Sequence, residues 1–188
     1  MPERGEIAQA LYAAWRLARL DRLGMHYFDL SHQAVWKSFW ASALCYPGFL
    51  ALLFLRLDDA TVARTSLTNI LLVETIGYVV AWTAFPLLAL SFCQRIGRAE
   101  KGFDFLIAYN WSQVWQTSMF VAVGLVTAFL VPHRLAPNID LAAYVAALGY
   151  EGFIAWAAIG AGAWIAGALV CLDLILGVSI ALTTSSFY

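Results

Sequence analysis

Long apolar segments recur along nearly the whole chain after residue 34. A helix needs roughly 20 mostly apolar residues to cross the hydrocarbon core of a bilayer. Of the 188 residues, 62% are hydrophobic and 12% are charged. Soluble domains carry about 25% charged residues, and their cores do not require apolar segments of this length and number. The sequence therefore predicts an all-α fold, a polytopic bundle of transmembrane helices.

The breaks between the apolar segments predict five spans. They cover about residues 35–55, 67–92, 105–131, 139–159 and 164–182. The boundary between the last two depends on Gly160 and Gly162, which divide an apolar stretch too long for one helix. Pro47 should kink the first span, because proline removes a helical hydrogen bond. Residues 35–188 thus form one transmembrane unit, preceded by a separate segment at residues 1–34.

The distribution of basic residues predicts the orientation of these spans. Lys and Arg concentrate in the amino-terminal segment and in the loop at residues 94–104, whereas the loops at 57–66 and 132–138 carry one each. Short cytoplasmic loops are enriched in Lys and Arg. We therefore expect the amino terminus in the cytoplasm and the carboxyl terminus outside, with the chain in a bacterial inner membrane.

Residues 1–34 contain a predicted amphipathic helix. Its apolar face would consist of Ile7, Leu11, Ala14, Trp15 and Ala18, and the basic residues Arg16, Arg19 and Arg22 flank or oppose it. Such a helix can lie on the membrane surface, with the arginines against anionic lipid. It can equally pack on the cytoplasmic ends of the spans. Asp29 or Ser31 is predicted to cap the helix that follows.

Three acidic residues, Glu74, Glu151 and Asp173, lie inside predicted spans, and no Lys, Arg or His lies deep in any span. Inserting an acid at the centre of a bilayer costs about 2.5–3.5 kcal/mol. Desolvation disfavours the charged form of a carboxyl group. We therefore expect these acids to be protonated, and we expect Glu74 in particular to donate a hydrogen bond to a neighbouring span.

Other polar residues fall at similar depths in the spans, about 12–20 Å from the cytoplasmic ends by helical rise. The predicted intramembrane polar cluster consists of Glu74, Tyr78, Asn110, Gln113, Thr117, Glu151 and Asp173. Three interpretations remain open. The residues could join helices by hydrogen bonds, form a functional core for protons, ions or a small solute, or contact a second membrane protein.

Small residues predict where helices approach closely. Ala163 and Gly167 form a small-xxx-small pair, and Gly149, Gly152 and Gly160 thin the fourth span. Such residues allow close backbone contact between membrane helices.

Catalytic and cofactor-binding motifs are not found in the sequence. There is no nucleophile elbow, phosphate-binding loop, dinucleotide fingerprint or HExxH zinc motif. The three histidines lie far apart, and the three cysteines lack metal-ligand spacing. We therefore expect no enzyme activity, no cofactor and no metal. The net charge of −1 gives no indication of a nucleic-acid partner.

Several short stretches resemble the YIP (Ypt/Rab-interacting protein) superfamily of five-span membrane proteins, including its bacterial members. They are "WRLARLDRLG" followed by "FDLS", "WTAFPLLALSF", "IAYNWSQV", and "YEGFIA" with "CLDLILG". The amino-terminal DLYGP-type motif of eukaryotic members is absent, so the resemblance implies the membrane architecture and no functional residues.

Two functions are consistent with this architecture. The first is a non-enzymatic bundle that binds or organises other membrane components. The second is a small oligomeric transporter or proton-coupled permease that uses the intramembrane acids. The expected partners are the lipid bilayer and either other membrane proteins or further copies of the chain.

Overall fold

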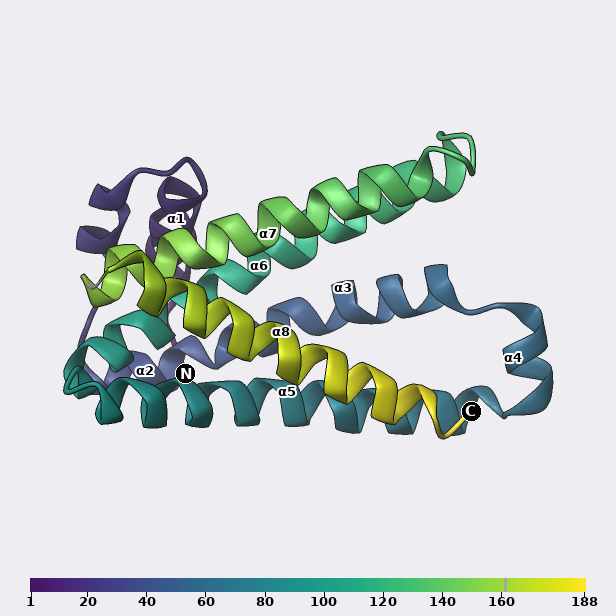
Figure 1. Ribbon diagram of the computed structural model, residues 1–188, viewed down its shortest axis with the longest axis horizontal. Helices are drawn as coiled ribbons and strands as arrows, with labels where there is room; N and C mark the ends of the chain where they lie inside the picture. The colour runs from purple at the N-terminus through teal and green to yellow at the C-terminus, as the bar shows by residue number, and fades with distance from the viewer. Residues whose placement is uncertain (161) are drawn as a thin grey trace.

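The computed structural model describes residues 1–160 and 162–188, which are helical and contain no strand (Figure 1). The elements are α1 (Arg4–Ala18), the 3-10 helix η1 (Arg22–Tyr27), α2 (His32–Ser38), α3 (Trp40–Arg56), α4 (Asp59–Arg64), α5 (Leu67–Arg95), α6 (Ala99–Phe129), α7 (Ala136–Ile159) and α8 (Ala163–Ser185). The all-α prediction is therefore confirmed for this part of the chain.

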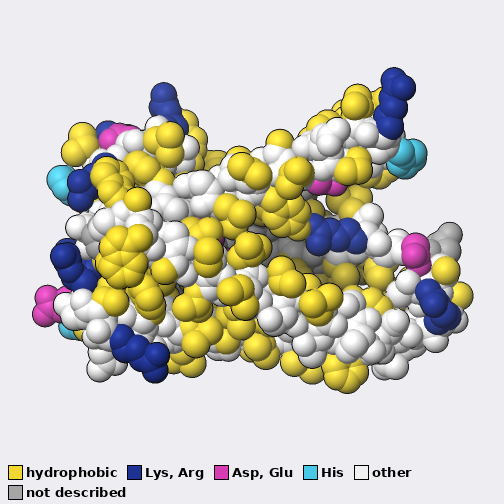
Figure 2. Space-filling model, viewed as in Figure 1, with side chains coloured by type: hydrophobic (Ala, Val, Ile, Leu, Met, Phe, Trp, Pro, Cys, Tyr) yellow, Lys and Arg dark blue, Asp and Glu magenta, His cyan; other side chains and the backbone are white. Residues whose placement is uncertain are grey.

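Four helical stretches of the described residues are long and apolar enough to cross a membrane. They are His32–Arg56, which combines α2 and α3, and the helices α5, α7 and α8. Their outward surfaces stay apolar, as shown by Ile76 on α5 and Ile175 on α8, which are 63% and 67% exposed. Apolar side chains cover much of the face in Figure 2. Extensive exposed apolar surface is typical of a surface that meets lipid or a partner.

Helix α6 is the longest helix, with 31 residues, yet it does not belong to this apolar set. Its middle carries Asn110, Ser112, Gln113, Gln116 and Thr117, which lower its mean hydropathy. The structure places α6 at the centre of the bundle, in contact with α1, α2, α3, α5 and α7. Several of these polar side chains, those of Asn110, Ser112 and Gln116, are therefore buried against other helices.

The two ends of the bundle differ. One end holds α1, η1, the α5–α6 turn and the α7–α8 turn, and we call it the basic end (Figure 1). Its basic residues include Arg16, Arg19, Arg22, Arg95, Arg98 and Lys101. The other end holds α4, the α6–α7 turn and the carboxyl terminus. There α6 and α7 diverge from α3, α5 and α8, and we call it the open end (Figure 1).

Helix boundaries follow local signals in the sequence. Helix α7 ends at Gly160, whose φ of 64° lies in the left-handed region, and Gly162 caps α8. This is the position at which the apolar stretch was predicted to divide. Ser31 caps α2, since its side chain accepts a hydrogen bond from the Ala34 N–H at 3.2 Å. Helix α3 continues through Pro47, and the first long helical stretch is interrupted earlier, at Phe39.

Helix α1 packs on the bundle through a face that overlaps the predicted one only in part, at Ile7, Leu11 and Ala14. The residues buried beneath it are Ala10, Ala13, Ala14 and Leu17, whereas Trp15 and Ala18 are exposed. The Tyr150 hydroxyl donates to the Ala14 carbonyl at 2.6 Å, and the Trp115 indole donates to the Leu11 carbonyl at 2.9 Å. Small alanines let α1 approach α6 and α7 closely. Of the two placements considered for this helix, the structure has it packed on the end of the bundle.

The closest helix approaches occur at glycines other than the predicted ones. A Cβ added at Gly149 or Gly167 would meet nothing within 4 Å. In contrast, a Cβ at Gly77 would lie 2.6 Å from the Thr184 Cγ2, and one at Gly48 would lie 2.6 Å from the Thr117 Cγ2. The pairs α5–α8 and α3–α6 therefore depend on these two glycines for their separation.

Candidate functional site

A cleft of about 210 Å³ lies between α5, α6 and α8. Its lining residues are Ala81, Trp82, Pro86, Tyr109, Asn110, Gln113, Asp173, Leu176 and Gly177. By helical rise, Asp173 and Asn110 lie about 15 Å and 16 Å along their helices from the basic end. A hydrocarbon core is about 30 Å thick. The cleft therefore lies near the middle of the apolar part of the bundle.

The most polar wall of the cleft is formed by Asp173 of α8. The Tyr109 hydroxyl donates a hydrogen bond to the Asp173 Oδ1 at 3.0 Å. The ring of Tyr109 packs against those of Phe85 and Phe105, with centroid distances of 4.5 Å and 5.6 Å. These contacts fix the hydroxyl in place, so Asp173 keeps an oriented donor on one side.

Glu151 of α7 lies behind this wall and is 3% exposed. Its carboxyl group lies near that of Asp173, and we call the two residues the carboxyl pair. The ion pairs of the described residues all lie elsewhere, so no Lys or Arg side chain compensates this pair. Two adjacent carboxylates repel each other when both are charged. The arrangement is therefore suited to holding a shared proton or a cation.

Asn110 joins the cleft to the first long helical stretch. Its Nδ2 donates to the Ser38 Oγ at 2.8 Å, and the Ser38 hydroxyl donates to the Val35 carbonyl at 2.7 Å. Both side chains are fully buried. Within the described part of the protein, the Asn110 Oδ1, the Gln116 Nε2 and the Glu151 Oε1 make no hydrogen bond. Such atoms are uncommon, since most buried polar groups are paired.

The structure brings together only part of the predicted polar cluster. Asn110, Gln113 and Asp173 line one cleft, and Glu151 lies near Asp173. The other three predicted members lie outside this group.

Glu74 lies toward the open end, where the Tyr188 hydroxyl donates to its Oε1 at 2.5 Å. Glu74 thus accepts this hydrogen bond from the carboxyl-terminal residue, instead of donating one to a neighbouring span as we expected. The Tyr78 hydroxyl donates to the Ser42 carbonyl at 2.6 Å, and Thr117 packs against Gly48. Helical depth alone does not show which face of a helix turns inward, and this explains the division of the cluster.

Two residues of the site, and one buried polar residue outside it, were not predicted. Tyr109 precedes Asn110 in the sequence, and its hydroxyl makes the direct bond to Asp173. Ser38 supplies the partner of Asn110, and Gln116 carries one of the unpaired atoms. The polar run "YNWSQVWQ" was a signal for Tyr109 and Gln116. The "KSFW" segment gave no comparable signal for Ser38, because an isolated serine is common in helices.

The predicted membrane-surface arginines have contacts within the chain. The Arg16 Nε donates to the Asp21 Oδ2 at 2.6 Å, and its Nη1 donates to the Tyr27 hydroxyl at 2.8 Å. This bond from Arg16 lowers the pKa of Asp21 below its ordinary value of 3.8. Arg19 lies over the ring of Trp15, and Arg22 lies over that of Trp156. Arg16 therefore stabilises the α1–η1 turn.

The described residues contain no cluster of three or more His, Cys, Asp or Glu side chains that could hold a metal ion. Comparison of the chain with family models, curated proteins and solved structures found no match.

Proposed function

We propose that this chain is a non-enzymatic integral membrane protein that binds a polar group of another membrane component in the cleft between α5, α6 and α8. The observation that carries the proposal is the convergence of Asn110, Gln113 and Asp173, from two helices, on one cleft at mid-depth. Hydrogen bonds strengthen where water is excluded, so a small set of such groups can select a polar ligand in an apolar setting.

The proposal includes five spans, with α6 crossing the membrane as well as the four apolar stretches. Its length of 31 residues supports this, as does its enclosure by other helices. The gathering of basic loops at one end supports a cytoplasmic amino terminus in a bacterial inner membrane. Membership of the YIP superfamily is also part of the proposal. It is supported by the number of long helices, which matches a five-span protein. A reporter fused after Tyr188 tests the topology. It should report the periplasmic side, and a cytoplasmic signal would contradict five spans.

A photoreactive residue in the cleft tests the binding. A benzoylphenylalanine at Leu176 should form a defined adduct in native membranes, and Asp173→Leu should abolish that adduct while the protein still accumulates. The matched control is the same residue at Ile175, the neighbour of Leu176, which is 67% exposed on the outside of α8. Identical adducts at both positions would mean that the cleft holds bulk lipid only, and the proposal would fail.

A second function, proton-coupled movement of a solute, is supported by the carboxyl pair Glu151–Asp173. A proton shared by the pair would change the charge of the cleft wall when it leaves. Glu151→Gln and Asp173→Asn keep the shape and hydrogen-bonding capacity of the pair but cannot release a proton. In a binding protein these variants should fold and retain the Leu176 adduct. In a proton-coupled protein they should fold and lose activity, together with a protonated-carboxyl C=O band in the infrared spectrum.

A further inference from the structure

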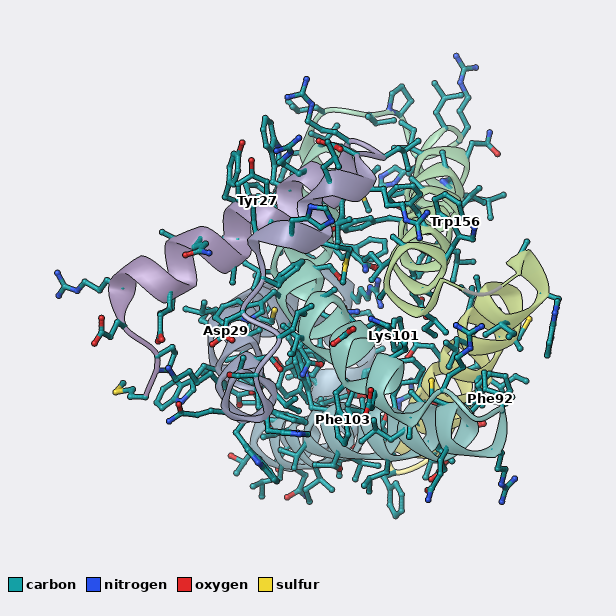
Figure 3. The ribbon with its side chains drawn as sticks, turned by 90° about the vertical axis from the view of Figure 1, so that its left-hand side faces the viewer. Tyr27, Asp29, Phe92, Lys101, Phe103 and Trp156 are labelled. Atoms are coloured by element: carbon teal, nitrogen blue, oxygen red, sulfur yellow. The ribbon has the colours of Figure 1, made fainter. Side chains whose placement is uncertain are left out.

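The basic end contains a second cavity, about 480 Å³ in volume, that the proposed function does not use. It lies between η1, the segment after it, the start of α6 and the end of α7. Its polar lining consists of Arg22, His26, Lys101 and Asp104, and its apolar lining includes Leu23 and Leu30. Figure 3 views this end directly, with Lys101 on α6 and Trp156 on α7 labelled.

Arg22 is the best-placed cation in this cavity. Its guanidinium lies 4.8 Å from the centroid of the Trp156 ring, and its Nη2 lies 4.0 Å from where a Cβ at Gly160 would be. It makes no hydrogen bond or ion pair with the residues that the structure describes. A cation–π contact orients the guanidinium but leaves its N–H donors free. Arg22 is therefore held at the end of α7 with donors available for an anion.

The other charged groups leave the cavity basic. The Lys101 Nζ forms an ion pair with the Asp104 Oδ2 at 2.8 Å. Asp104 is the only acidic residue in the lining. Arg22 and the exposed His26 lack such a partner among the described side chains. Leu23 and Leu30 remain 57% and 43% exposed beside these groups. The cavity is therefore complementary to a ligand that has an anionic group beside an apolar part.

We propose that this cavity binds the headgroup of an anionic phospholipid, with the phosphate at Arg22 and Lys101 and the acyl chains against Leu23 and Leu30. Basic pockets between helices at the cytoplasmic side of a membrane are suited to anionic headgroups. Arginine also binds phosphate through paired N–H donors. The ligand is a lipid instead of a soluble phosphate ester because apolar side chains border the basic groups. This site is independent of the cleft at mid-depth.

Quenching of Trp156 by brominated lipids tests the proposal. The protein is reconstituted into vesicles that mix phosphatidylcholine and phosphatidylglycerol, with bromine on one lipid in one preparation and on the other lipid in a second. The signal of a Trp156→Phe variant is subtracted to isolate Trp156. We expect phosphatidylglycerol to be favoured over phosphatidylcholine beside Trp156 by about fivefold, the effect of one basic group near the surface. Arg22→Ala should abolish most of this preference, and Arg22→Lys should retain part of it.

The control is Arg64→Ala, which removes an exposed arginine from α4 at the open end and should leave the preference unchanged. Circular dichroism confirms that each variant is folded. Equal quenching by the two lipids in the unmodified protein would overturn the proposal. It would also be overturned by a preference that survives both Arg22→Ala and Lys101→Ala. Displacement of the lipid by millimolar inorganic phosphate would assign the site to a soluble anion.

Discussion

Replacing Gly77 by alanine should destabilise the protein, because α5 and α8 are in contact at this glycine. The added Cβ would lie 2.6 Å from the Thr184 Cγ2 and 3.3 Å from the Ile180 Cγ2. Carbon atoms pack best at about 3.5–4.0 Å, so the first contact is too short by roughly 1 Å. Thr184 is β-branched and therefore stiff at χ1. Its hydroxyl also donates to the Ala181 carbonyl at 3.2 Å, a bond that rotation would break.

The size of the effect follows from two opposing contributions. Overpacking of a well-filled interface costs about 1–3 kcal/mol. Alanine stabilises a helix interior by about 0.5–1 kcal/mol relative to glycine. The net loss of unfolding free energy for Gly77→Ala should therefore be about 0–2.5 kcal/mol, and about 1–3 kcal/mol relative to a glycine-to-alanine change in a helix that meets no neighbour.

Unfolding by sodium dodecyl sulfate from a mild detergent, followed by circular dichroism, measures this loss. Gly149→Ala is the matched control, because a Cβ there meets nothing within 4 Å, and it should be neutral or slightly stabilising. Adding Thr184→Ser to Gly77→Ala removes the clashing methyl group and keeps the hydroxyl, so it should restore stability. If Gly77→Ala matches the control, or if Thr184→Ser does not rescue it, the α5–α8 packing described above is incorrect.

Three further predictions concern hydrogen bonds elsewhere in the bundle. A double-mutant cycle with Ser38→Ala and Asn110→Leu should give a coupling of about 0.6–2 kcal/mol in the same unfolding assay, and additive losses would contradict their bond. Tyr150→Phe removes a hydrogen bond worth about 1 kcal/mol and should speed amide exchange in α1 roughly fivefold by mass spectrometry, whereas unchanged exchange would mean that other contacts hold α1. Since Arg16 lowers the folded-state pKa of Asp21, their bond stabilises the α1–η1 turn fully above the ordinary pKa of 3.8 and is lost as the pH falls through the lowered value. The protection of amides in residues 16–27, measured against their intrinsic exchange rates, should therefore decrease below pH 3.8, and Asp21→Asn should remove that pH dependence.

Some features of the fold were predictable because a single local signal determines them. A few neighbouring residues are enough to indicate a long apolar helix or a glycine at which a helix ends. The helical nature of the chain and the break at Gly160 could therefore be predicted from the sequence. The face on which α1 packs was predictable only in part. The apolar face chosen from the sequence included Trp15, but close packing on α6 and α7 selects the small residues Ala10 and Ala13 beside the predicted Ala14.

The candidate site was predictable in part for a similar reason. Depth along a helix follows from counting residues, so Asn110, Gln113 and Asp173 could be placed at one level. The rotation of each helix depends on its neighbours, and this determined that Glu74 bonds Tyr188 instead of reaching the cleft. The proximity of Glu151 and Asp173 depends on how α7 packs against α8. Sequence spacing contains no information about that proximity.

Helix α8 forms one wall of the cleft, and access to the cleft depends on how this helix is held in place. It packs against α5 and α7 and carries Asp173, and only 17% of its most apolar stretch is buried, so much of its surface lies on the outside of the bundle. Its start is joined to α7 at Gly160, where the backbone turns sharply, and its far end is held by the contact between Gly77 and Thr184. Gly77→Ala should loosen that far end and leave the residues of the cleft unchanged. If α8 controls access, hydrogen exchange of the carboxyl pair, read from its infrared band, should become faster in this variant. Unchanged exchange in a destabilised Gly77→Ala protein would show that the cleft opens through another helix.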